Sequence, residues 1–118
     1  MKNRILSFGY AIHGIKVAFK EEPNFRIHVL GLIVVLSFGF YCNLSVSEWI
    51  QISIVSSIVI ITELLNTAIE DICNYITKER ITAIGRIKDV AAAAVLVSAI
   101  MAALVGFLIF KPYIVSFF

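Results

Sequence analysis

Residues 49–69 read WIQISIVSSIVIITELLNTAI, a stretch of 21 residues in which Glu63 is the only charged side chain. A helix needs about 20 predominantly apolar residues to cross the hydrocarbon core of a bilayer, which is about 30 Å thick. Two further stretches, 27–44 and 90–110, are similarly apolar. The sequence therefore predicts an all-α membrane protein with three transmembrane helices.

The composition of the 118-residue chain agrees with a bilayer environment, because 60% of the residues are hydrophobic and only 15% are charged. Soluble domains average about 45–50% apolar and about 25% charged residues. A chain of this length forms one domain, so we expect residues 1–118 to form a single membrane-embedded unit. The net charge of +2 is too small to indicate nucleic acid as a partner, and two cysteines are too few for a disulfide scaffold.

The basic residues mark two of the polar flanks. Every Lys and Arg except Lys111 falls within 2–26 or 78–88, whereas the turn at 43–48 has none. Positive residues gather on the cytoplasmic side of membrane helices. We therefore expect the N-terminus and the loop at 71–89 to be cytoplasmic, the 43–48 turn and the C-terminus to be outside, and the protein to be a multi-pass protein of the cytoplasmic membrane.

The N-terminal segment, residues 1–24, mixes apolar and basic side chains. Its apolar residues recur at spacings of three and four from Ile5 to Phe19, with four basic residues in the same segment. This pattern is typical of an amphipathic helix that lies in the membrane interface. Pro23 is expected to end or redirect that helix.

Three polar side chains interrupt the apolar surface near the end of the second span. At 100° per residue, Glu63, Asn66 and Glu70 fall within an arc of about 60° on one helix face. An ionisable residue in the bilayer costs about 2.5–3.5 kcal/mol on insertion scales, so such a stripe indicates a function or a tightly paired interface. Two interpretations without catalysis are open: an ion or proton pathway, and a structural stripe that only holds a helical bundle together.

Charged residues at the cytoplasmic mouths of the other two spans favour an enzyme. Glu22 precedes the first span, and Lys88 and Asp89 open the third. Mg²⁺ is bound by one or two carboxylates together with substrate phosphates, so Glu22 and Glu70 would form a sufficient pair. Phosphoryl transfer further needs a base for the attacking hydroxyl, and Glu63 lies deep enough to accept a proton from a lipid.

The segment 63–70, ELLNTAIE, resembles the signature of the small prokaryotic integral-membrane diacylglycerol kinase family, which includes the undecaprenol kinases. The segment 18–26, AFKEEPNFR, resembles the start of that family's first span, and Lys88-Asp89 resembles the start of its third. The likeness extends from about residue 9 to about residue 106. It implies a homotrimeric helical bundle in the bacterial inner membrane, which transfers the γ-phosphate of ATP, with Mg²⁺, to a lipid hydroxyl.

The resemblance also implies a role for each polar residue. Glu63 would be the general base, and Asn66 would orient the reacting groups. Glu22 and Glu70 would hold the metal. The implied nucleotide and cofactor contacts are Tyr10, Glu22, Glu70, Lys88 and Asp89.

The acceptor expected from the resemblance is diacylglycerol, which would become phosphatidic acid, and the alternative acceptor is undecaprenol. The segments EEPNFRIH at 21–28 and NTA at 66–68 look closer to the undecaprenol-preferring branch. The family often has a histidine in the cytoplasmic loop, where this chain has Glu79-Arg80-Ile81. His28 is interpreted as an interfacial histidine with a satisfied hydrogen bond.

Overall fold

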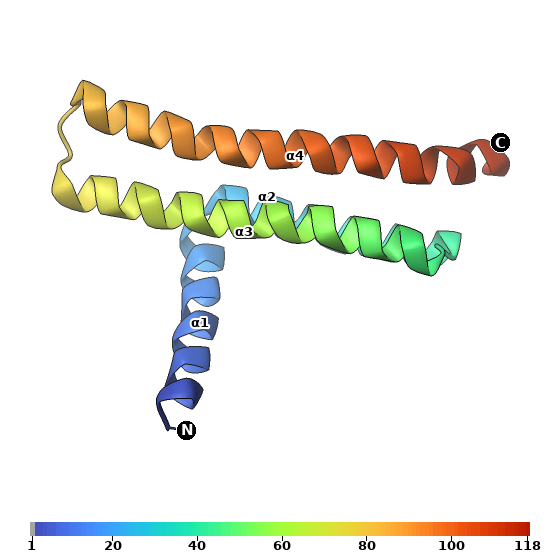
Figure 1. The fold of residues 1–118 in the computed structure, drawn as a ribbon, viewed down its shortest axis with the longest axis horizontal. Helices are drawn as coiled ribbons and strands as arrows, with labels where there is room; N and C mark the ends of the chain where they lie inside the picture. Colours follow the sequence, from blue (N-terminus) through green and yellow to red (C-terminus); the bar gives the residue numbers. More distant parts are fainter. Residues whose placement is uncertain (1) are drawn as a thin grey trace.

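The computed structural model describes residues 2–118, and this range consists of four α-helices without β-strands. They are α1 (Lys2–Glu21), α2 (Pro23–Cys42), α3 (Val46–Ile76) and α4 (Thr82–Phe117). α2, α3 and α4 run alongside one another, whereas α1 projects away from them (Figure 1). Each of α2, α3 and α4 is long and apolar enough to cross a membrane, which confirms the prediction of an all-α chain with three membrane helices.

Pro23 separates the first two helices. α1 ends at Glu21, and Pro23 occupies the first turn of α2, where its missing N–H costs no helical hydrogen bond. The Nη1 atom of Arg26 donates hydrogen bonds to the carbonyl oxygens of Phe19, at 2.8 Å, and Lys20, at 2.9 Å. The last turn of α1 is therefore tied to the first turn of α2.

α3 begins with a capping box and continues well past the expected span of 49–69. The backbone N–H of Glu48 donates to the Ser45 hydroxyl oxygen at 3.2 Å, and the backbone N–H of Ser45 donates to the Glu48 carboxylate at 3.0 Å. No Gly or Pro interrupts residues 46–76, so the helix runs for 31 residues, or about 46 Å. This length exceeds the hydrocarbon thickness of about 30 Å, so α3 extends beyond the bilayer core.

The connection between α3 and α4 is much shorter than the loop expected at 71–89. α3 ends at Ile76 and α4 begins at Thr82, so only residues 77–81 link them. The rest of the expected loop extends the two helices. α4 likewise runs to Phe117, beyond the expected span of 90–110, and the two helices form a long hairpin (Figure 1).

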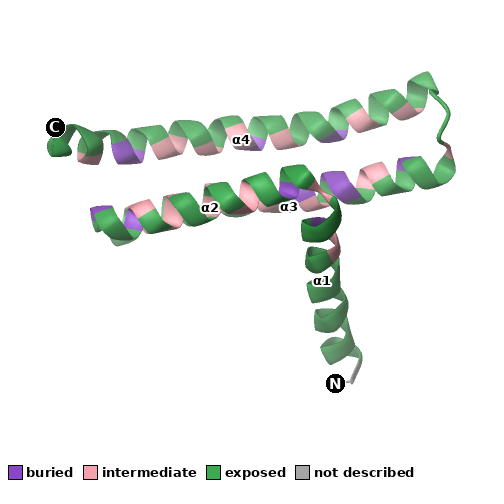
Figure 2. Ribbon diagram, turned by 180° about the vertical axis from the view of Figure 1, so that it is seen from behind, coloured by how far each residue is buried: buried purple, intermediate pink, exposed green. Residues whose placement is uncertain are grey.

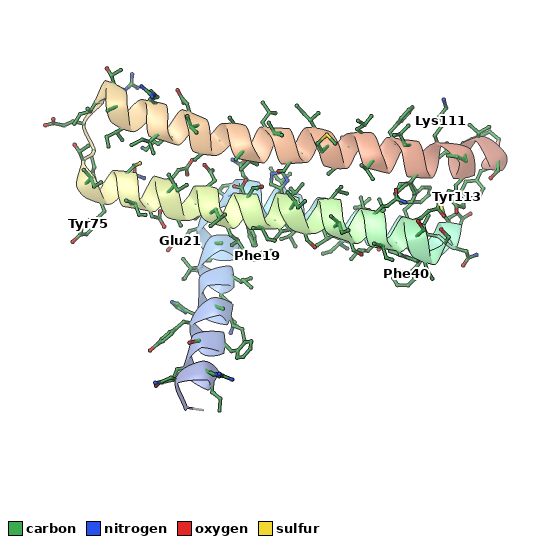
Figure 3. All side chains as sticks on the ribbon, in the orientation of Figure 1. Phe19, Glu21, Phe40, Tyr75, Lys111 and Tyr113 are labelled. Carbon is green, nitrogen blue, oxygen red and sulfur yellow. The ribbon has the colours of Figure 1, made fainter. Side chains whose placement is uncertain are left out.

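Hydrogen bonds between side chains join α3 to α4 along the hairpin. The hydroxyl oxygens of Thr62 and Ser98 lie 2.9 Å apart midway along the helices. The Tyr113 hydroxyl donates to the Glu48 carboxylate at 2.6 Å. Tyr113 lies at the end of the hairpin opposite to Tyr75 (Figure 3). One end of the hairpin thus carries Tyr113, and the other end carries the connecting segment.

Few side chains are buried within the single chain (Figure 2). A buried apolar cluster lies where the α2–α3 turn meets α4, and it consists of Cys42, Leu44, Ile52, Ile109 and Phe110. Elsewhere α2, α3 and α4 expose large apolar side chains such as Leu30, Ile54 and Leu104. Apolar surface of this extent is typical of helices that face lipid or further copies of the chain.

α1 is helical and exposes apolar residues, among them Ile5, Phe8 and Ile12, in a segment that also carries lysines. Its amphipathic, interfacial position stays a prediction, as does the homotrimer.

Candidate active site

The polar stripe of α3 lies in the half of the helix that approaches the connecting segment. Glu63 is 2% exposed, Asn66 is 8% exposed and Glu70 is half-buried. The amide Nδ2 of Asn66 donates to Oε1 of Glu70 at 3.4 Å, one helical turn along. The helical periodicity thus places a buried carboxylate, an amide and a second carboxylate in sequence along α3.

The carbonyl oxygen of the Asn66 amide is buried without a hydrogen-bond partner among residues 2–118. Buried polar atoms are nearly always hydrogen-bonded in folded proteins. An unpaired oxygen beside Glu70 is therefore an available ligand for a cation or for a group that donates a hydrogen bond.

His28 is brought to Glu63 by the packing of α2 on α3. The imidazole Nε2 of His28 lies 3.7 Å from Oε2 of Glu63. The His28 side chain is 24% exposed, whereas that of Glu63 is only 3% exposed. The sequence interpretation, which treated His28 as an interfacial residue, missed this pairing, although a lone imidazole among apolar residues of a span was a signal for it.

Glu22 joins the same region from the junction between α1 and α2. Partial burial raises the pKa of the Glu22 carboxyl above its ordinary value of 4.5, and the negative charges of Glu70, Asp71 and Glu63 raise it further. These charges act on Glu22 because α1 and α2 both contact α3. The Glu22 carboxyl at the α1–α2 junction is therefore close enough to α3 for the charges of its carboxylates to act on it.

These oxygen donors fit Mg²⁺ better than a metal that needs a cage of protein ligands. In the described part of the chain, no three His, Cys, Asp or Glu side chains are grouped closely enough to form such a cage. Mg²⁺ takes oxygen ligands, keeps several waters and commonly uses only one or two carboxylates with substrate phosphates. Glu22, Glu70 and the unpaired oxygen of Asn66 are oxygen donors of the type that Mg²⁺ takes.

The other residues expected at the site are Lys88, Asp89 and Tyr10, and they lie at different distances from the cluster of Glu22, Asn66 and Glu70. The ammonium group of Lys88, on α4, donates to Oδ1 of Asn74 at 2.7 Å, which places Lys88 one turn beyond Glu70 along α3. Asp89, the next residue of α4, is exposed. Tyr10 is 71% exposed on α1, and no hydrogen bond within residues 2–118 joins it to the cluster.

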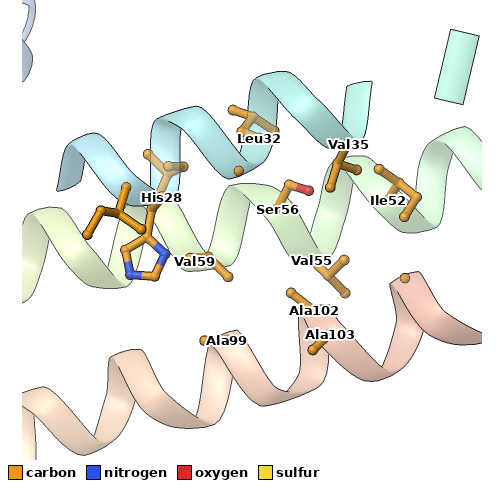
Figure 4. Close-up of a pocket in the computed structure, with 14 residues that line it drawn as sticks. His28, Leu32, Val35, Ile52, Val55, Ser56, Val59, Ala99, Ala102 and Ala103 are labelled. Atoms are coloured by element: carbon orange, nitrogen blue, oxygen red, sulfur yellow. The ribbon is translucent and has the colours of Figure 1, made fainter. Parts of the chain in front are cut away.

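An apolar groove of about 320 Å³ lies among α2, α3 and α4, with His28 at one end (Figure 4). Small residues keep it open on the α4 side, namely Ala99, Ala102, Ala103 and Gly106. On α3 the groove reaches Ile60, one helical turn from Glu63. The groove therefore ends at His28, whose imidazole lies 3.7 Å from the buried Glu63 carboxylate.

Known proteins match this chain over most of its length. The family model described as prokaryotic diacylglycerol kinase matches residues 9–110. The undecaprenol kinase of Bacillus subtilis is 39% identical over 106 residues, which cover 90% of this chain and 86% of that protein. The diacylglycerol kinase of Synechocystis is 35% identical over 115 residues, covering 97% and 66% of the two chains. The Escherichia coli K12 diacylglycerol kinase is 36% identical over 100 residues, covering 83% and 80%.

Three membrane-length helices, one of which carries the buried carboxylate of Glu63, together with these matches define a membrane-embedded lipid kinase. The chain belongs to the prokaryotic diacylglycerol kinase family.

Proposed function

We propose that the chain transfers the γ-phosphate of ATP to the hydroxyl of a membrane lipid, with Mg²⁺ as cofactor. The observation that carries this proposal is the buried Glu63 carboxylate beside the end of an apolar groove. A lipid alcohol whose hydrocarbon tail lies in the groove presents its hydroxyl within one helical turn of Glu63. The apolar interior of a membrane helix bundle is otherwise an expensive place for a carboxylate.

Each polar residue has a role in this proposal. Glu63 accepts the proton of the lipid hydroxyl as that oxygen attacks the γ-phosphorus atom, and the bond from that atom to the β–γ bridging oxygen breaks to release ADP. Glu22 and Glu70 hold Mg²⁺, which neutralises charge on the phosphate oxygens when bound. Asn66 orients the reacting groups through its amide, and its unpaired oxygen supports that role.

Two of the proposed nucleotide contacts come from α4, and a third comes from α1. Lys88 meets phosphate charge, and its present hydrogen bond to Asn74 places its ammonium group near Glu70. Asp89 contacts the nucleotide from α4, and Tyr10 contacts it from α1. We further propose that the N-terminus and the connection at 77–81 face the cytoplasm of a bacterial inner membrane, where ATP is available, and that the enzyme is a homotrimer.

Undecaprenol is one candidate acceptor, supported by the Bacillus subtilis undecaprenol kinase, which is 39% identical to this chain. The segments at 21–28 and 66–68 support the same assignment. Diacylglycerol is the second candidate acceptor, supported by relatives from Synechocystis and Escherichia coli that bear the name diacylglycerol kinase. Parallel assays with each lipid and radiolabelled ATP distinguish the two.

The test of the function compares the wild type with Glu63→Gln in mixed micelles that contain Mg²⁺ and ATP. We expect the wild type to phosphorylate a lipid alcohol and Glu63→Gln to lose about 100-fold or more in kcat, because the amide accepts no proton. Glu48→Gln, at the opposite end of α3, is the matched control and should retain activity. Wild-type protein that phosphorylates neither lipid would overturn the proposal, as would a folded Glu63→Gln variant with full activity.

A further inference from the structure

The Glu63 carboxylate needs a compensating partner because it is almost entirely buried in an apolar span. Burying a carboxylate without a partner is strongly unfavourable, and an unpaired charge of this kind tends to be neutralised. A neutralised carboxyl group accepts no further proton from a substrate. The identity of its partner therefore bears directly on whether Glu63 can act as a base.

The polar side chains next to Glu63 on α3 bond elsewhere. The Asn66 amide donates to Glu70, and the Thr67 hydroxyl donates to the backbone carbonyl of Glu63 at 3.0 Å. The Thr62 hydroxyl pairs with Ser98 on α4. Among residues 2–118, His28 is the group whose side chain forms a charge-compensating contact with the Glu63 carboxylate, at 3.7 Å.

His28 comes from a well-anchored part of α2. Phe25, one turn before it, is only 2% exposed, and Arg26 is hydrogen-bonded to the end of α1. This anchoring limits the positions that the first turns of α2 can take. The imidazole therefore reaches Glu63 from an anchored segment of α2.

We propose that His28 is a positioning residue for Glu63, whose carboxylate it holds and compensates at the end of the apolar groove. The inference rests on the proposed role of Glu63 as the base. The ring presents an N–H at Nε2, as the imidazolium or as that tautomer, toward Oε2 of Glu63. His28 lines the end of the groove, but its effect on the reaction runs through Glu63, so its loss lowers kcat more than it changes the KM for the lipid.

A matched pair of variants tests this geometry. In His28→Gln the amide nitrogen occupies nearly the position of Nε2, whereas in His28→Asn the shorter amide reaches only the position of Nδ1. We expect His28→Gln to retain most of the wild-type kcat. For His28→Asn we expect kcat to fall by about 10- to 100-fold, the loss typical when a residue that orients a functional group is replaced. The KM for the lipid should change little in either variant. His13→Asn, which alters an exposed histidine of α1, is the control and should keep the wild-type kcat.

The outcomes separate this inference from the proposed function. Equal kcat values for His28→Gln and His28→Asn overturn the positioning role, as does a loss that appears only in the KM for the lipid. Thermal melting of both variants in detergent measures how much of each is folded. If the two variants have the same kcat per mole of folded protein, the positioning role is also overturned. Absence of lipid phosphorylation in the wild type overturns the proposed function instead.

Discussion

The ammonium group of Lys88 on α4 donates a 2.7 Å hydrogen bond to the amide oxygen of Asn74 on α3. Lys88 was expected at the start of the third span, whereas position 74 falls in the loop expected at 71–89, and the hairpin brings Lys88 and Asn74 together close to the connecting segment. The bond holds a cation one helical turn from Glu70. It therefore links the packing of the hairpin to the charge of the proposed nucleotide site.

Replacing Lys88 by Met should lower kcat/KM for ATP by about 10- to 100-fold, because a hydrogen bond to a charged group contributes about 1.5–3 kcal/mol. Steady-state kinetics with varied ATP measure the effect. Lys111→Met is the matched control, since Lys111 lies at the opposite end of α4 over the ring of Phe107 (Figure 3). A Lys88→Met enzyme with an unchanged kcat/KM for ATP contradicts the assignment.

Glu22→Gln should stabilise the metal-free protein near neutral pH. The fold raises the pKa of Glu22 above 4.5, chiefly through burial and the charge of Glu70. The native state therefore binds the Glu22 proton more tightly than the unfolded state, and the free energy of unfolding falls as the pH rises through these pKa values. The amide removes this penalty, so the melting temperature should rise at pH 7.5 and stay unchanged at pH 4. Thermal melts in detergent with a chelator check this, with Glu79→Gln in the connecting segment as control.

Ser98→Ala should weaken the contact between α3 and α4. Its hydroxyl lies 2.9 Å from that of Thr62, and hydrogen bonds between membrane helices contribute about 0.6 kcal/mol on average. Ser57 provides the control, because its hydroxyl donates to the carbonyl of Ser53 on its own helix. Denaturation in mixed micelles should show a lower free energy of unfolding for Ser98→Ala than for Ser57→Ala, and the reverse order would refute the prediction.

Ala102→Phe should fill the groove among α2, α3 and α4 and raise the KM for the lipid several-fold. Ala102 lines the groove away from the His28 end, so the kcat with a short-chain lipid alcohol should remain close to the wild-type value. The KM is measured for acceptors of increasing chain length. A KM that is equally raised for short and long chains argues that the tail does not lie in the groove.

The three spans could be predicted from sequence because transfer into hydrocarbon depends on the residues of a segment, with little influence from distant ones. The ends of the helices could not. The apolar stretches end at 69 and resume at 90, yet α3 continues to Ile76 and α4 starts at Thr82. Helical hydrogen bonding does not stop where hydropathy falls, and the paired helices support each other beyond the apolar stretch through contacts such as that between Lys88 and Asn74.

Part of the candidate site followed from sequence in the same way. Glu63, Asn66 and Glu70 share one face of α3 because the helical repeat alone dictates it. The pairing of Asn66 with Glu70 is a contact between neighbouring turns. The approach of His28 to Glu63 depends on how α2 rotates and packs against α3, and the periodicity of α2 contains no information on that rotation.

The sequence by itself thus determined the three apolar helices and the polar stripe on the second, because partitioning and helical periodicity are properties of a local segment. The tertiary structure alone decided how other helices approach that stripe. It brings His28 to Glu63, and it joins Lys88 to Asn74, one turn beyond the stripe. Those meetings depend on helix packing, in which many weak contacts between distant segments jointly fix the rotation and register of each helix.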